Sequence, residues 1–160
     1  VIVEEVGLDK LGKFVKNPIG FSISGYYGPN IQREGACGKD DVFQPNYLES
    51  VIQVLGGKPV SLSYRTQSVG VPSLLSEEST ALKQAAAVLS EAKNEGAEML
   101  VSICTLSHGV LDVYQVKAGK VSGENTSIPV IHFTELLAFS MGHFNTRLAQ
   151  LKTRISVIGN

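Results

Sequence analysis

The stretch MLVSIC, residues 99–104, is the most apolar run in the chain. Strands that are buried on both faces of a parallel sheet have such near-continuous apolar sequences, so we expect this stretch to be the central strand. Three other short runs, rich in β-branched or aromatic residues, predict further strands at residues 19–27, 58–64 and 129–132.

Helical patterns separate these strands. Apolar side chains recur every three or four residues at 45–55, 76–94, 107–116, 133–141 and 144–151, whereas residues 118–127 are a polar, glycine-rich connector. Strands that alternate with helices imply parallel pairing through right-handed crossovers. We therefore predict an α/β fold, with a small parallel sheet flanked by helices in layers.

Composition limits the classes of function. The chain has 160 residues, enough for one domain, and 14 basic against 15 acidic side chains, which argues against nucleic acid as a partner. It has no apolar run of about 18 residues that would span a bilayer. Its two cysteines do not make a disulfide framework, so we expect an intracellular location. Because the chain begins at Val1, we expect a processed product or a piece of something longer.

The carboxyl ends of the predicted strands are where a ligand site forms in an open α/β sheet. The segments concerned are YYGPN at 26–30, RTQSVG at 65–70 and CTLSH at 104–108. If the strands are parallel, all three end at one crevice.

Two catalytic or metal-binding constellations are conceivable there. Cys104 and His108 are four residues apart and could form a thiolate–imidazole pair, although a small buried cysteine is the simpler interpretation. Cys37, Cys104, His108 and either His132 or His143 include zinc-ligand types, but without the spacing of a known zinc site. We predict no metal site and no confident catalytic residue.

The three strand ends resemble the cysteine-rich (CCG) domain of the heterodisulfide reductase B-type proteins and their relatives. YYGPN is similar to the segment with the family's first cysteine, YRTQSVG to Cys-Cys-Gly, and SICTLSHG to Cys-Pro-Leu-Cys-His. The resemblance places five residues at the family's cluster-ligand positions, namely Pro29, Ser68, Val69, Cys104 and Ser107. It implies that residues 18–160 are a degenerate second CCG domain, and that residues 1–17 are a connecting helix from a first domain that is missing or separate.

The resemblance implies that the iron–sulfur chemistry of the family has been lost. Clusters need several thiolates, and of the five positions only Cys104 keeps one. Pro29 and Val69 cannot ligate, and serine hydroxyls ionise far less readily than thiols. We therefore expect no cofactor in this chain, with an iron–sulfur cluster as the less favoured alternative.

The function implied by the resemblance is a non-catalytic structural or anchoring subunit of an electron-transfer oxidoreductase complex, with the succinate dehydrogenase or fumarate reductase type favoured. Its expected partners are flavoprotein and iron–sulfur subunits, and a first CCG domain on a separate chain where one exists. Peripheral membrane contact through FTELLAFSMGHF, residues 133–144, would suit the cytoplasmic face of a membrane or the mitochondrial inner membrane.

Two other functions stay open at the level of sequence. The chain could be an active heterodisulfide or thiol oxidoreductase component that uses Cys104, or that holds a cluster completed by another chain. It could also bind a small molecule in the emptied crevice, for which the sequence names no ligand.

Overall fold

The computed structural model describes residues 1–143 and contains one four-stranded sheet, all of whose strands run parallel. The strands are β1 (Ser22–Tyr26), β2 (Lys58–Val60), β3 (Met99–Ser102) and β4 (Val130–His132), in the order β2-β1-β3-β4. The apolar run at residues 99–104 does form a central strand, paired with β1 on one side and β4 on the other. The predicted α/β class is confirmed.

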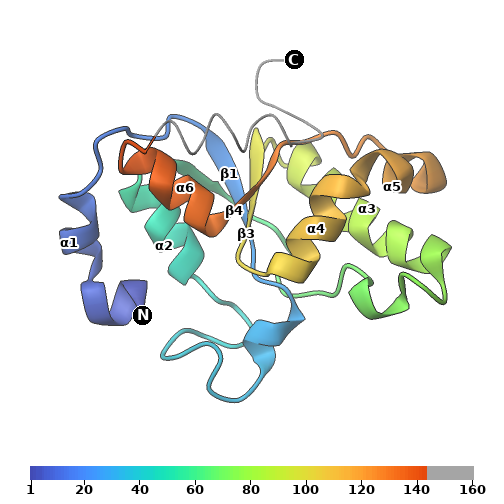
Figure 1. Cartoon of the computed structure of the whole chain (residues 1–160), viewed down its shortest axis with the longest axis horizontal. Coiled ribbons are helices and arrows are strands. Elements are labelled where there is room, and N and C mark those ends of the chain that lie inside the picture. The colour runs from blue at the N-terminus through green and yellow to red at the C-terminus, as the bar shows by residue number, and fades with distance from the viewer. Residues whose placement is uncertain (144–160) are drawn as a thin grey trace.

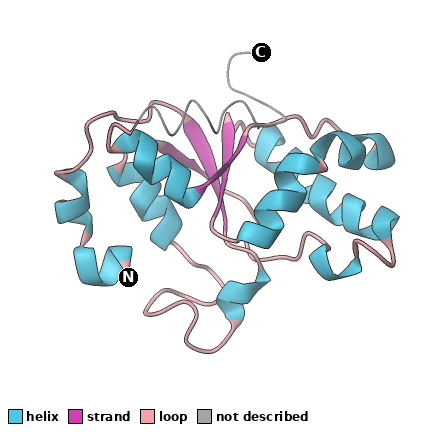
Figure 2. Cartoon of the chain, in the orientation of Figure 1, coloured by secondary structure: helices cyan, strands magenta, loops and turns pink. Residues whose placement is uncertain are grey.

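Helices cover both faces of this sheet (Figures 1 and 2). On one face lie α1 (Leu8–Gly12), α2 (Tyr47–Val54) and α6 (Phe133–Ser140), and on the other lie α3 (Glu78–Asn94), α4 (Thr105–Val113) and α5 (Gln115–Ser122). Successive side chains of a strand point to opposite faces, and the molecule accordingly has two apolar cores. Ile23 contributes to the core under α2, whereas Leu100 contributes to the core under α3.

The predicted helix at residues 1–17 is wrong in its continuity. A π-helical turn, Ile2–Val6, and the short α1 are separated by Gly7, whose φ of 83° lies outside the helical region. Apolar spacing alone does not reveal this break. Phe14, which follows the end of α1, is 51% exposed.

The connector predicted at residues 118–127 is also wrong, because its first part is the helix α5. Ala118 is fully buried, and Gly119 lies where an added Cβ would be 2.6 Å from the Thr126 hydroxyl oxygen. The glycine therefore serves close packing inside a helix rather than loop flexibility. The other predicted helix within residues 1–143 that shifts noticeably is α4, which begins at Thr105 and ends at Val113.

The apolar side chains of α6 pack against the core of the sheet. Leu136 is buried, and Leu137 and Phe139 are partly buried against the same cluster. Of the segment 133–144 for which membrane contact was predicted, the apolar side chains within residues 133–143 are thus largely packed inside the domain, and residue 144 lies outside the described residues. Within residues 1–143, no helix is long and apolar enough to cross a membrane. The helix predicted at residues 144–151 lies outside the described residues.

Candidate functional site

Backbone and tyrosine hydrogen bonds join the carboxyl ends of the strands. The backbone N–H groups of Tyr27 and Gly28 both donate to the carbonyl oxygen of Arg65, at 2.8 and 3.0 Å. The Tyr26 hydroxyl donates to the carbonyl oxygen of Gln67 at 2.6 Å. The N–H of Ile103, directly after β3, donates to the Tyr26 carbonyl at 3.2 Å. The predicted meeting of the three segments at one edge is confirmed.

Cys104 lies at this edge, in the N-cap position of α4. Its Sγ is 3.3 Å from the hydroxyl oxygen of Ser107, which is buried. Partial burial alone would raise the pKa of the Cys104 thiol. Hydrogen bonds from the Ser107 hydroxyl, from the N–H groups of Ser107 and Leu106, and from the Asn30 side chain outweigh burial and lower that pKa below its ordinary value. These hydrogen bonds therefore stabilise the thiolate form of Cys104 relative to a cysteine in water.

The Tyr26 hydroxyl lies close to both Ser107 and Cys104. Burial raises the pKa of Tyr26 to about 12, although the Ser107 hydroxyl opposes the rise, while charge on Cys104 adds to it. The phenol consequently stays protonated and keeps its donor bond to Gln67. Gly28, at a φ of 77°, passes over the ring, and an added Cβ would lie 3.5 Å from the Ser107 hydroxyl oxygen.

His108 lies one helical turn after Cys104, in α4. Its backbone N–H donates to the Cys104 carbonyl oxygen at 2.8 Å, as in any helical turn. The imidazole packs edge-on against that of His132, with the ring centroids 5.7 Å apart. His132 itself caps α6, with its Nδ1 as acceptor for the N–H of Thr134 at 3.4 Å. The hydrogen bonds that lower the pKa of the Cys104 thiol come from a hydroxyl, from backbone N–H groups and from the Asn30 side chain.

The other three positions that the resemblance assigned to cluster ligands lie in different environments. Val69 is 1% exposed and belongs to the apolar core under α3. Ser68 is exposed, and its hydroxyl accepts a bond from the N–H of Gly70 at 3.1 Å. Pro29 begins a 3-10 turn and lines, with Ser68, a groove beside α3. The assignment of these positions to a former ligand set stays a prediction.

Cys37 borders a mainly apolar cavity of about 320 Å³ on the α2 side of the sheet, together with Tyr27, Tyr47 and Ile103. Among the described residues, no group of three or more His, Cys, Asp or Glu side chains is arranged to hold a metal ion.

A hydrogen-bonded network that the sequence did not predict lies on the α2 side of the sheet, at the carboxyl end of β1. The Tyr27 hydroxyl donates to Glu49 at 2.5 Å and accepts from the N–H of Leu48 at 2.8 Å. Nη1 of Arg65 lies 3.2 Å from the same carboxylate, and the side chains of Arg65 and Glu49 are 23% and 12% exposed. Burial raises the pKa of Glu49, with the Tyr27 bond and the Arg65 charge opposing the rise.

One signal for this network was available in the sequence. Gly25 sits inside β1, where a glycine marks a close approach of another element. An added Cβ at Gly25 would be 2.9 Å from Leu48 and 3.3 Å from the Glu49 carboxylate, so the glycine admits the first turn of α2.

Comparison with known proteins places this site in context. No family model matches the chain. It is 26% identical over 137 residues to the 8-methylmenaquinol:fumarate reductase membrane anchor subunit of Wolinella succinogenes, covering 84% of this chain and 48% of that protein. It is 23% identical to the B component of the ferredoxin/F(420)H(2)-dependent CoB-CoM heterodisulfide reductase of Methanosarcina acetivorans, covering 88% and 48%. The B component of the ferredoxin:CoB-CoM heterodisulfide reductase of Methanosarcina mazei is 24% identical, with the same coverage.

The chain is thus a distant homologue of subunits of fumarate reductase and heterodisulfide reductase, and it spans about half the length of these curated relatives. The sequence resemblance is confirmed at that level. A crystal structure of a hypothetical protein from Helicobacter pylori shares the fold, with a TM-score of 0.69 and 16% identity over 94% of this chain and 28% of the other.

Proposed function

We propose that this chain is a non-catalytic structural subunit of an electron-transfer reductase complex, built on a degenerate CCG domain that no longer holds a cluster. The observation that carries the proposal is the environment of Cys104. Its sulfur is 3.3 Å from a serine hydroxyl oxygen, and the segments after β1 and β2 contribute Pro29 and a core-buried Val69. These residues do not fit an iron–sulfur cluster, which needs several thiolates around one cavity.

The relatives support the class of complex. They are subunits of fumarate reductase and of heterodisulfide reductase, and the favoured host is of the fumarate reductase or succinate dehydrogenase type. Flavoprotein and iron–sulfur subunits would then be the partners, at a membrane surface on the cytoplasmic side or in the mitochondrial inner membrane. Because the apolar face of α6 packs against its own domain, we infer that the chain is anchored in the complex through contacts with partner subunits.

The decisive experiment measures iron and acid-labile sulfide per chain after anaerobic expression and reconstitution. A structural subunit has far less than one iron per chain, and Cys104→Ala leaves that value unchanged. Cys37→Ala is the matched control, since Cys37 lines the apolar cavity on the α2 side and Cys104 does not. Several irons per chain with equal sulfide, lost in Cys104→Ala but kept in Cys37→Ala, would contradict the proposal and indicate an electron carrier.

A second function is favoured by one observation, the lowered pKa of the Cys104 thiol. An active thiol oxidoreductase needs such a thiolate to be reachable from solvent. Alkylation of the native protein by iodoacetamide at neutral pH tests this, with peptide mapping to separate Cys104 from Cys37. A Cys104 that reacts more slowly than Cys37 would remove the second function.

A further inference from the structure

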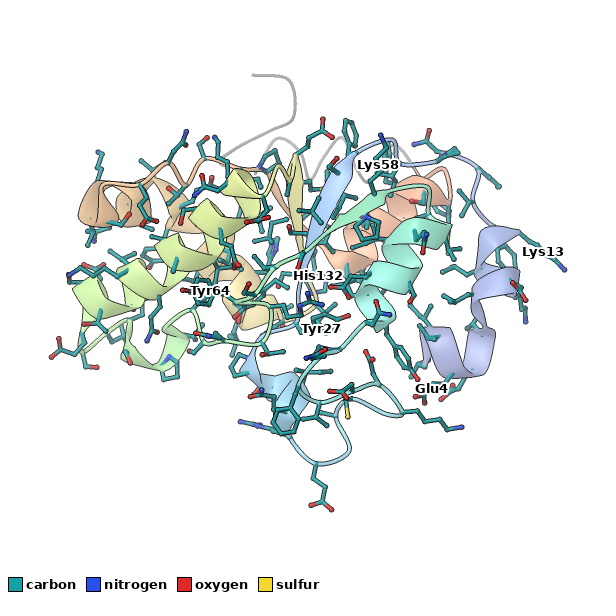
Figure 3. The ribbon with its side chains drawn as sticks, turned by 180° about the vertical axis from the view of Figure 1, so that it is seen from behind. Glu4, Lys13, Tyr27, Lys58, Tyr64 and His132 are labelled. Atoms are coloured by element: carbon teal, nitrogen blue, oxygen red, sulfur yellow. The ribbon has the colours of Figure 1, made fainter. Side chains whose placement is uncertain are left out.

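A polar groove of about 690 Å³ lies between α3 and the loop that follows β2. Its walls include Tyr64, Gln67 and Ser68 from the loop and Thr80, Lys83 and Gln84 from α3. Figure 3 shows Tyr64 against this helix, on the side of the sheet away from α1. The groove does not include Cys104, so it is a feature separate from the thiol.

The face of α3 that lines the groove is continuous. Thr80, Lys83, Gln84 and Ala87 follow one another at spacings of three and four residues, which places them on one side of the helix. The buried side chains of the same helix, including Ala81 and Leu82, face the core instead. The polar stripe therefore has no role in packing the domain.

The loop opposite this stripe is fixed at both ends. At one end, the carboxylate of Glu91 accepts bonds from the N–H groups of Ser63 and Tyr64, at 2.8 and 3.1 Å. At the other end, Gly70 approaches α3 so closely that an added Cβ would be 2.4 Å from the Cα of Ala81. The walls of the groove are consequently held in place before any ligand arrives, which lowers the entropic cost of binding.

The charge in the groove is positive and therefore favours an anionic ligand. Among the described residues that line it, Lys83 is the one charged side chain, and the others bear hydroxyl, carboxamide or apolar groups. Lys83 belongs to neither of the ion pairs Glu49–Arg65 and Glu78–Lys117, and no carboxylate lines the groove among the described residues. The nearby Glu91 carboxylate is turned to backbone N–H groups.

We propose that this groove binds a small organic acid, with its carboxylate on Lys83 and its hydroxyl or amide groups on Gln67 and Gln84. A single ammonium suits one carboxylate, whereas a dianionic phosphate is usually held by several cations or by a glycine-rich loop. The volume falls within the range of small-molecule sites. The emptied edge of the sheet would then have kept a ligand-binding role that needs no thiolate.

The test is a titration of the ¹⁵N-labelled protein followed by NMR, using two matched pairs of probes. Gluconate and pantothenate each carry one carboxylate, and sorbitol and panthenol are their uncharged counterparts. We expect at least one acid to cause saturable shifts at residues 64–68 and 80–84, and neither neutral counterpart to do so. Lys83→Gln should weaken that binding by about tenfold, the effect of losing a charge-assisted hydrogen bond. Lys58→Gln, at an exposed lysine on β2, should leave it unchanged.

Three results would overturn the proposal. The first is the absence of saturable shifts with both acids in a protein whose spectrum is that of a folded domain. The second is equal binding of an acid and its neutral counterpart, or of an acid to the wild type and to Lys83→Gln. The third is binding of inorganic phosphate at the same residues as tightly as the better acid, which would indicate an unspecific anion site.

Discussion

Tyr26 and Tyr27 are neighbours in β1 and its carboxyl end, yet they serve two different kinds of site. Tyr26 faces the α3 core and bonds to a backbone carbonyl beside the Cys104 thiol. Tyr27 faces the α2 core and bonds to the carboxylate of a partly buried ion pair. Because alternate residues of a strand point to opposite faces, one dipeptide joins a thiol site and a charged network. The first site leaves its thiol partly exposed, whereas the charges of the second are paired within the domain.

This contrast predicts that the charged network is the more costly one to break. Arg65→Met leaves the Glu49 carboxylate buried without its cation, so we expect a loss of about 3 kcal/mol in the free energy of unfolding. Urea denaturation at neutral pH measures it. Lys117→Met breaks the exposed pair with Glu78 and should cost about 0.5 kcal/mol or less. Equal losses in the two variants would show that Glu49 is solvated.

The loop that follows β2 contributes to both sites, and its Gly70 is a second position where we expect a substitution to lower stability strongly. Gly70→Ala places a Cβ against Ala81 at a φ of 77°, and we expect it to lower stability by about 2–3 kcal/mol. Gly96→Ala is the matched control, since it has a similar φ of 85° and nothing within 4 Å of the added atom. The control should cost about 1 kcal/mol, from backbone strain alone. A thermal or urea unfolding series separates strain from the clash.

Substituting the tyrosines themselves sharpens the comparison. Tyr27→Phe removes the donor to Glu49 and the acceptor for the Leu48 N–H, so we expect a loss of about 2 kcal/mol. Tyr26→Phe removes one bond to a backbone carbonyl and should cost about 1 kcal/mol. The reverse order in urea denaturation would contradict the view that the charged network contributes more stability.

The smallest effect on stability, and the clearest effect on chemistry, is expected from Ser107→Ala. Its hydroxyl helps to lower the pKa of Cys104, so its removal should raise that pKa and slow alkylation at neutral pH by a few-fold. Because the pKa of Cys104 is lower in the folded protein than in the unfolded chain, the unfolded chain keeps the thiol proton up to a higher pH. We therefore expect the free energy of unfolding of the wild type to rise with pH between these two pKa values. Ser102→Ala is a useful control, since the Ser102 hydroxyl bonds the backbone of Cys104 rather than its sulfur. An unchanged pH midpoint of alkylation in Ser107→Ala would contradict the assignment.

The pattern of apolar residues predicted the secondary structure correctly where the same residues are buried in the folded domain. The run at residues 99–104 is apolar because both of its faces are covered, and the predicted strand, its parallel pairing and the meeting of the three strand ends all follow from that. Glycine was the main source of error. Gly7 interrupts a helical pattern and Gly119 sits inside a helix, and the same residue type has opposite consequences in the two places.

The sequence by itself determined the α/β class, the parallel strands and the edge at which Cys104 lies, because hydrophobic periodicity and strand order depend on residues close together in the chain. Tertiary structure alone decided which groups meet at that edge. The Ser107 hydroxyl reaches the thiol, Val69 is buried in the core, and Glu49 pairs with Arg65 sixteen positions away. These pairings depend on side-chain direction and on how closely α2 and α3 approach the sheet, and spacing along the chain does not encode either.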